Sequence, residues 1–157
     1  LRGDVPTMRR RMMAAYQLLT SQPGVDSSKV VALGYSIGGL AAFELARGGA
    51  QLAGVVSMWG ILETKRPEDK VDAQTKVLIF HGTLDPLTSA EAVTAFETEL
   101  QRAKIDYQLV KYGGVAHAFT VPAVGTDVTT GFAYDAAADR RSWAVLETFL
   151  KEVGPSE

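Results

Sequence analysis

Residues 29–39 read Lys-Val-Val-Ala-Leu-Gly-Tyr-Ser-Ile-Gly-Gly. The apolar run over residues 29–33 is typical of a buried strand, and the helical pattern over residues 37–47 ends at Gly48 and Gly49. Between these two elements lies the pattern Gly-x-Ser-x-Gly, with Ser36 on the turn from strand to helix. The place of this serine, more than the short pattern itself, points to a nucleophile held above the edge of a sheet.

The surroundings of Ser36 suit this interpretation. A serine on such a sharp turn adopts a strained backbone, and its neighbours must be small because strand and helix approach closely. The N–H of Ile37 and the helix N-terminus would face an oxyanion formed beside Ser36, so Ile37 is the expected oxyanion-hole donor. The alternative is a glycine-rich turn that binds phosphate at the helix start, but no Lys or Thr completes a phosphate loop.

Helices alternate with short apolar runs along the rest of the chain. Further strands are expected over residues 52–58, 76–80 and 107–111, and further helices over residues 7–20, 88–102 and 136–153. Strands separated by helices pair in parallel through right-handed crossovers. We therefore expect one α/β domain over residues 1–157, with a parallel sheet of about four strands flanked by helices.

Details of two helices can also be predicted. The first helix should bury four residues that recur at helical spacing: Met8, Met12, Ala15 and Leu19. Successive side chains of a helix point about 100° apart, so the basic run over residues 9–11 is expected on an ordinary solvated surface. Thr88 and Glu91 match a capping box at the start of the third helix.

Composition limits the classes of partner. The 157 residues include 16 Lys plus Arg against 18 Asp plus Glu, a net charge of −2, which argues against nucleic acid or anionic lipid as partners. The chain has no cysteine, which excludes disulfides and a thiolate nucleophile and is usual in a reducing compartment, so a cytoplasmic location is expected. No run approaches the roughly 18 apolar residues of a membrane span. Because the chain opens with Leu1, preceding residues of the natural protein are expected to have been removed or left out.

A serine hydroxyl needs a base, and the base needs an orienting acid, in the chain order Ser, acid, His. Of the two histidines, His117 is the candidate base because its loop follows the fourth strand and can reach the carboxyl edge of the sheet. His81 ends the third strand and is interpreted as structural, bonding loop backbone groups. Asp85 reaches the same edge and is the candidate acid. Three other carboxylates remain in reserve for that role: Asp69, Asp72 and Asp127.

At these places the sequence resembles the dienelactone hydrolase family, a branch of the α/β hydrolases. The segments that carry the resemblance span most of the chain: residues 34–39, 81–86, 112–119 and 138–143. The resemblance implies the C-terminal part of an α/β-hydrolase fold. It also implies hydrolysis of small-molecule esters or lactones through an acyl-enzyme, without metal or organic cofactor, with Ser36, Asp85 and His117 in the triad positions.

The sequence departs from the family in three ways. The family uses a cysteine where this chain has Ser36, so serine esterase chemistry is expected. It carries an arginine where this chain has Val121, which favours a less anionic substrate. In the family, further strands precede the first helix and supply an oxyanion donor. The strand over residues 29–33 should therefore have an open edge, which the remainder of a longer protein or another copy of the chain would complete.

The walls of a substrate pocket are expected from residues beside catalytic turns or strand ends: Tyr35, Trp59, Leu87 and Phe119. The leading hypothesis is a carboxylic-ester or lactone hydrolase, and acyl transfer or peptide hydrolysis would use the same triad. The alternative class is a non-catalytic binding or scaffold protein that kept the fold.

Overall fold

Four parallel strands form the centre of the computed structural model, which describes residues 3–63 and 71–154. In chain order they are β1 (Val31–Tyr35), β2 (Gly54–Met58), β3 (Lys76–Gly82) and β4 (Tyr107–Tyr112). The strands lie in the order β1-β2-β3-β4, and each pairs in parallel with the next. The α/β class and the number of strands are therefore confirmed.

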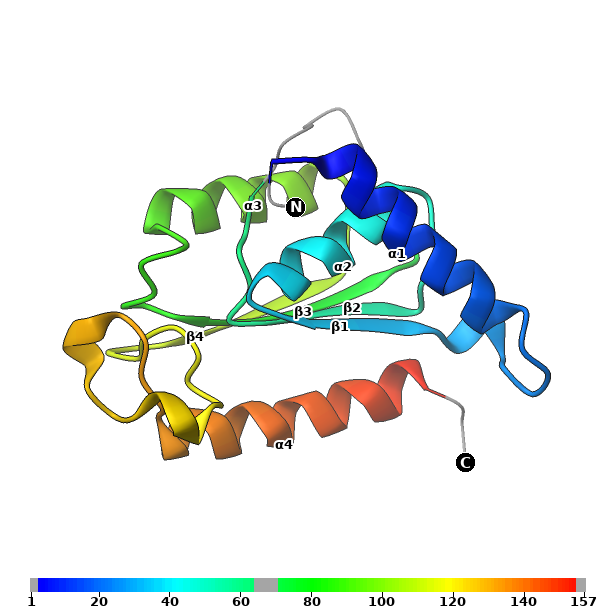
Figure 1. Cartoon of the computed structure of the whole chain (residues 1–157). Helices are drawn as coiled ribbons and strands as arrows, with labels where there is room; N and C mark the ends of the chain where they lie inside the picture. Colours follow the sequence, from blue (N-terminus) through cyan, green and yellow to red (C-terminus); the bar gives the residue numbers. More distant parts are fainter. Residues whose placement is uncertain (1–2, 64–70, 155–157) are drawn as a thin grey trace.

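Helices cover both faces of this sheet. They are α1 (Val5–Thr20), α2 (Ile37–Arg47), α3 (Ala90–Arg102) and α4 (Ala136–Val153). Figure 1 shows α1, α2 and α3 on one face and α4 on the other. A long segment between β4 and α4, with short 3₁₀ turns at Pro122–Val124 and Val128–Thr130, lies beyond the carboxyl ends of the strands.

The core consists of one apolar cluster on each side of the sheet. On the side of α2 and α3, the rings of Phe43 and Phe96 meet edge to face at 4.7 Å between centroids, beside Val77. On the side of α4, Leu78 packs with Leu146. Because successive residues of β3 point to opposite faces and both faces are covered, β3 reads as a continuous apolar run.

β1 is the exception among the strands. It pairs only with β2, from Val31 opposite Gly54 to Tyr35 opposite Met58, and its other edge has no partner strand among the described residues. Leu33 is 39% exposed. The strand is thus half-buried, not buried as expected, and its open edge is as expected. It also starts two residues late, because Ser27–Lys29 forms a 3₁₀ turn.

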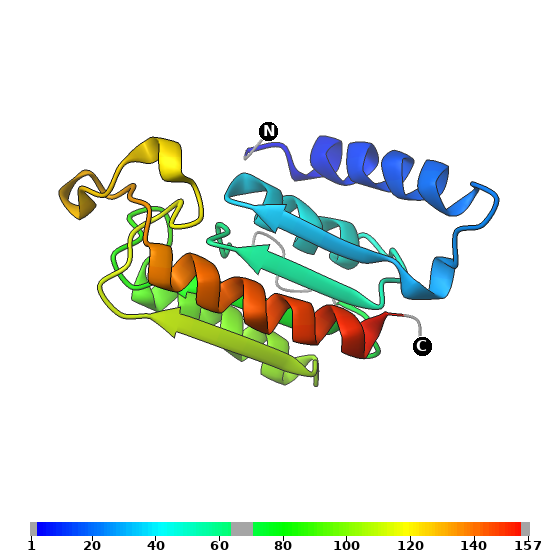
Figure 2. The same cartoon turned by 90° about the horizontal axis from the view of Figure 1, so that it is seen from below.

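The buried face of α1 differs from the prediction in its second half. Met8 is buried and Met12 is partly buried, but Ala15 is exposed and Leu19 is 46% exposed. The reason is that α1 packs against α2 and lies at the margin of the sheet, beside the edge strand β1 (Figure 2). Within the part of the chain that the structure describes, no strand lies there to cover the end of the helix.

The predicted capping box of α3 is wrong by one residue. Ser89 is the N-cap, and its hydroxyl accepts a hydrogen bond from the N–H of Ala92 at 3.2 Å. Thr88 is buried instead, where its hydroxyl donates to the carbonyl of Gly60 and accepts from the N–H of Leu62, both at 3.3 Å. Thr88 therefore ties the start of α3 to the segment that follows β2.

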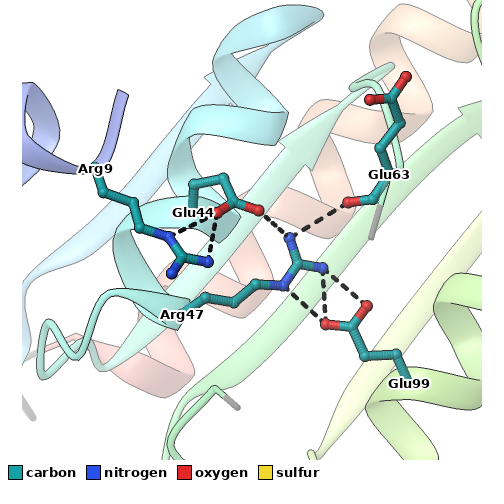
Figure 3. A network of polar contacts seen from close by, with 5 residues as sticks. All are labelled: Arg9, Glu44, Arg47, Glu63 and Glu99. Carbon is teal, nitrogen blue, oxygen red and sulfur yellow. Dashed lines mark hydrogen bonds and ion pairs between the residues drawn. The ribbon is translucent and has the colours of Figure 1, made fainter. Parts of the chain in front are cut away.

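A charged network, here called the arginine network, joins α1, α2 and α3 (Figure 3). The guanidinium of Arg47 donates to Glu44 at 2.7 Å and to both carboxylate oxygens of Glu99 at 2.8 and 2.9 Å. Arg9 donates to the other oxygen of Glu44 at 2.8 Å. The side chains of Arg47 and Glu44 are fully buried. Arg9 thus leaves the solvated surface expected for it, because Glu44 lies on the facing helix.

Candidate active site

The turn between β1 and α2 holds Ser36 in a conformation that few side chains adopt, with φ 53° and ψ −122°. A side chain at Gly34 would collide with the carbonyl of Gly38, and one at Gly39 would come within 2.6 Å of the Ser57 hydroxyl. The N–H of Ser36 donates to the carbonyl of Met58 at 3.3 Å. Glycine is therefore required at positions 34 and 39, before and after Ser36. The hydrogen bond to Met58 connects Ser36 to the end of β2.

Three side chains from separate parts of the chain meet at this turn. The hydroxyl of Ser36 lies 2.9 Å from Nε2 of His117, and Nδ1 of His117 lies 2.7 Å from Oδ2 of Asp85. A carboxylate only accepts, so we assign the hydrogen to Nδ1, which leaves Nε2 to accept from the hydroxyl of Ser36. We call this group the Ser36 cluster.

The backbone of the loop after β4 holds His117 in place. The N–H of His117 donates to the carbonyl of Gly131, and its carbonyl accepts from the N–H of Ala133, both at 3.0 Å. The imidazole meets the rings of Trp59 and Phe132 edge to face, at 4.9 and 5.1 Å between centroids. Two aromatic walls therefore restrict the ring to the plane that faces Ser36.

Asp85 is held just as firmly at the end of β3. Its Oδ1 accepts from the N–H of Leu87 at 2.8 Å, so both carboxylate oxygens have partners. The adjacent backbone is bonded to the loop after β4, since the N–H of Leu84 donates to the carbonyl of Val115 at 2.9 Å. Asp85 is 6% exposed, whereas Ser36 is partly accessible.

Backbone strain concentrates at the same place. Of the four non-glycine residues with positive φ in the described part of the chain, Ser36 (53°), Trp59 (40°) and Ala118 (62°) belong to this site. Such conformations each cost on the order of 1–3 kcal/mol and persist where the surroundings enforce them. Strain of this kind is typical of functional sites. The fourth residue, Lys104, lies outside this site, just after the end of α3.

The expected oxyanion donor lies at the first turn of α2. Ile37 begins the helix, and the Ser36 side chain makes no capping bond to it. The N–H of Gly39 in the same turn donates to the carbonyl of Ser36 at 3.0 Å. The side chain of Ile37 is 41% exposed. A role for the Ile37 N–H as an anion donor stays a prediction.

A cavity of about 310 Å³ lies beside the Ser36 cluster. Its lining consists of Tyr35, Trp59, Thr120, Val121 and Trp143. Two of the four expected pocket residues, Tyr35 and Trp59, are among them, and their rings pack at 5.4 Å between centroids. Thr120 and Trp143 were missed, because neither a loop threonine nor a tryptophan on a helix carries a local signal of its place beside Ser36.

The other two expected pocket residues lie elsewhere. Phe119 is completely buried and packs edge to face against Tyr112, so the expectation for it is wrong. The backbone turns at Ala118, with φ 62°, and directs the next residue into the core. Leu87 is partly buried against Met8 and its neighbours, and a contact with substrate remains a prediction for it.

The remaining candidates do not join the Ser36 cluster. His81 is buried, but its Nδ1 has no hydrogen-bond partner in the described structure, in contrast to the expected bonds with loop backbone. Burial lowers the pKa of its imidazole, and the Asp85 carboxylate opposes this shift. Asp72 and Asp127 cap their own turns through backbone N–H groups at 2.9 Å. Asp69 lies outside the described residues.

The described residues contain no group of three or more His, Cys, Asp or Glu side chains arranged to hold a metal ion. No helix within residues 3–63 and 71–154 is long and apolar enough to cross a bilayer.

A parallel sheet with a strained serine between a strand and the following helix is the arrangement of the α/β-hydrolase fold. Residues 4–154 match the dienelactone hydrolase family. The chain belongs to this family.

Individual relatives agree with this assignment. The chain is 33% identical over 148 residues to an uncharacterized protein of Caenorhabditis elegans, which covers 92% of this chain and 93% of that protein. It is 39% identical to a dienelactone hydrolase-like promiscuous phosphotriesterase, P91, from metagenomic libraries, with a TM-score of 0.84. A structure named m3DLH is 37% identical, with a TM-score of 0.89.

The two structures are longer than this chain. The similarity covers 97% of this chain but 64% of the phosphotriesterase, and 99% of this chain but 65% of m3DLH. The chain therefore spans slightly less than two thirds of the length of each.

Proposed function

We propose that this protein hydrolyses carboxylic esters or lactones through an acyl-enzyme on Ser36. The observation that carries the proposal is the continuous set of hydrogen bonds from Ser36 through His117 to Asp85, at 2.9 and 2.7 Å. Ser36 at one end is partly exposed, and the carboxylate of Asp85 at the other end is buried. A nucleophile must meet the substrate, whereas the orienting acid need not.

The proposed reaction has two halves. In the first, Nε2 of His117 takes the proton of Ser36 as its oxygen attacks the ester carbon, then gives that proton to the leaving alcohol. In the second, His117 takes a proton from water, the water oxygen attacks the acyl carbon, and the proton returns to Ser36 as the acid leaves. Asp85 stabilises the imidazolium that forms in each half.

The negative charge that develops on the carbonyl oxygen needs donors. In this proposal the Ile37 N–H, at the N-terminal end of α2, supplies one of them, because Ile37 directly follows Ser36, the N-cap of the helix. Removal of a single oxyanion donor typically costs about 10²–10³ in kcat. The activity of this chain thus depends on whether a second donor reaches the same space.

The direct test is labelling with a fluorophosphonate, which reacts only with an activated serine, alongside hydrolysis of p-nitrophenyl acetate. Wild-type protein should be labelled at Ser36, as identified by peptide mass spectrometry, and Ser36→Ala protein should not. Ser142→Ala is the matched control, since Ser142 is completely buried in α4 and bonded to the carbonyl of Asp139. A wild-type protein that is folded but not labelled at Ser36 would favour the non-catalytic scaffold, because labelling reports the activated serine, whereas turnover also depends on the second oxyanion donor.

A second candidate reaction is phosphotriester cleavage, which the name of the 39% identical structure suggests. Attack of Ser36 on diethyl p-nitrophenyl phosphate would release p-nitrophenol and leave a diethylphosphoryl group on the serine. One p-nitrophenol per protein would indicate attack without turnover, and continued release would indicate hydrolysis of the phosphoserine. No release from protein that a fluorophosphonate labels would contradict this second activity.

A further inference from the structure

The cavity beside Ser36 has a lining without any charged side chain. We call it the aromatic subsite, defined by its five lining residues: Tyr35, Trp59, Thr120, Val121 and Trp143. The indole N–H of Trp59 donates to the hydroxyl of Thr120 at 2.9 Å, so the one polar atom of that ring already has a partner inside the wall. What the subsite offers a ligand is mainly ring surface and the methyl groups of Val121.

The subsite lies next to the Ser36 cluster. Tyr35 directly precedes the serine, and the ring of Trp59 lies 4.9 Å from the ring of His117. A substrate group held between Tyr35 and Trp143 would therefore adjoin an ester carbon placed at the hydroxyl of Ser36. The subsite has a volume of about 310 Å³. This is large enough for an aromatic ring, since roughly 150 Å³ suffices for benzene in an apolar cavity.

The charge around the subsite disfavours an anion. No cation belongs to its lining, and Val121 offers no partner to a carboxylate. Burial raises the pKa of the Tyr35 hydroxyl, and the nearby Asp139 carboxylate adds to this effect. The field of Asp139 thus reaches the subsite, where it would repel a negatively charged ligand.

We propose that the aromatic subsite binds an uncharged aryl group, so that the substrates are neutral esters carrying an aromatic ring. This inference rests on the hydrolase function proposed above and adds the class of substrate to it. Tyr35 and Trp143 supply aromatic rings for offset or edge-to-face contact with the ligand. The hydrogen bond to Thr120 already fixes the ring of Trp59, so binding costs little side-chain entropy at this residue.

The composition of the chain provides a direct probe. It contains two tryptophans, Trp59 and Trp143, and both line the subsite. Tryptophan emission, excited where the ligand does not absorb, therefore reports occupancy without any turnover. The Ser36→Ala protein is titrated with methyl phenylacetate, which is neutral and aromatic, with methyl butanoate, which is neutral and aliphatic, and with monomethyl succinate, which is anionic.

Methyl phenylacetate should change the emission in a saturable way, with a Kd lower by about tenfold or more than that of monomethyl succinate, because an unpaired carboxylate resists burial. Methyl butanoate should fall between them. Trp143→Ala should weaken binding of the aromatic ester by about three- to tenfold, the loss expected for an aromatic contact. Trp143 is 46% exposed, so the fold should tolerate this change.

Val121→Arg should reverse the preference and favour monomethyl succinate. Leu18→Ala, at a 66% exposed residue of α1, is the control and should bind all three esters as the Ser36→Ala parent does. Equal affinity for the neutral and anionic esters, or no response to methyl phenylacetate up to its solubility limit, would overturn the subsite. This experiment measures binding to an inactive protein, so its failure would overturn the subsite alone. Failure of fluorophosphonate labelling would instead overturn the hydrolase function.

Discussion

α2 carries a buried polar group near each of its ends, and the two groups differ in ways that separate a reactive site from a structural one. At its start, the Ser36 cluster joins residues 81 and 32 positions apart in sequence. Three turns later, the arginine network joins residues 35 and 52 positions apart. Both bring distant polar side chains together inside the protein.

Burial and pairing are thus common to both groups, and neither feature alone indicates chemistry. In the arginine network, Arg47 and Glu44 are fully buried, and the guanidinium lies 5.3 Å from the centre of the Phe96 ring. In the Ser36 cluster, by contrast, the backbone of Ser36 is strained and the residue is partly exposed. Backbone strain and exposure of the serine are what distinguish the proposed active site.

The largest effect should come from the Ser36 cluster, on activity alone. Ser36→Ala or His117→Ala should lower kcat for a p-nitrophenyl ester by on the order of 10³ or more, whereas Asp85→Asn should cost less. The free energy of unfolding of Ser36→Ala should stay close to that of wild type. Both quantities are measured on the same preparations, by steady-state kinetics and urea denaturation. Normal turnover by Ser36→Ala would remove this serine from the mechanism.

A substitution in the arginine network should lower stability and leave activity nearly unchanged. Arg47→Met leaves Glu44 buried with less compensation, so the free energy of unfolding should fall by about 3–5 kcal/mol. Activity per folded molecule should change little, because the network lies away from Ser36 on α2. Urea denaturation and the ester assay test this contrast.

A second variant sharpens that test. Adding Glu44→Gln to Arg47→Met removes the buried charge and should recover part of the lost stability. If instead Arg47→Met abolishes turnover in protein that is still folded, the two groups are coupled through α2 and the comparison fails.

A substitution in β1, the edge strand that leads to Ser36, should have an intermediate effect, which is on the self-association of the chain. The open edge of β1 should make the 157-residue chain associate with itself, and Leu33→Lys should reduce this association because charge on an edge strand opposes pairing. Size-exclusion chromatography with light scattering, over a range of concentrations, measures the oligomer. Leu18→Lys on α1 is the control, since Leu18 is also exposed. An equal effect of both changes would contradict pairing through β1.

The smallest effect should come from a substitution of His81 and concern the pH dependence of stability. His81 is near Asp85 but does not belong to the Ser36 cluster. Its pKa lies below the usual 6.5 in the folded protein because of burial, so the unfolded chain binds the proton more readily. The stability contributed by neutral His81 is then complete above about pH 6.5 and is lost as the pH falls through the lowered pKa. His81→Gln should therefore reduce the acid-induced fall in Tm by about 2–4 °C. Parallel Tm profiles of the two proteins would contradict this assignment.

Much of the fold could be predicted because its signals are local. Apolar runs and helical periodicity identified the order of the strands and helices, and two glycines marked the end of α2. Errors arose where the neighbouring element was unknown. Leu19 fits the inner face of α1, but no strand among the described residues covers it. Ser89 replaces Thr88 as the cap because Thr88 is bonded to Gly60 and Leu62 instead.

For the candidate site, the sequence by itself determined the residue types, their order and the turn that carries Ser36, because a strained turn needs glycine and a nucleophile needs a base and an acid. Only the tertiary structure decided which other groups surround them. It placed Trp143 of α4 beside Tyr35, turned Phe119 into the core and paired Arg9 with Glu44. The reason is that helical and strand periods specify which side of an element is apolar, whereas the partner it meets depends on how distant elements pack across the sheet.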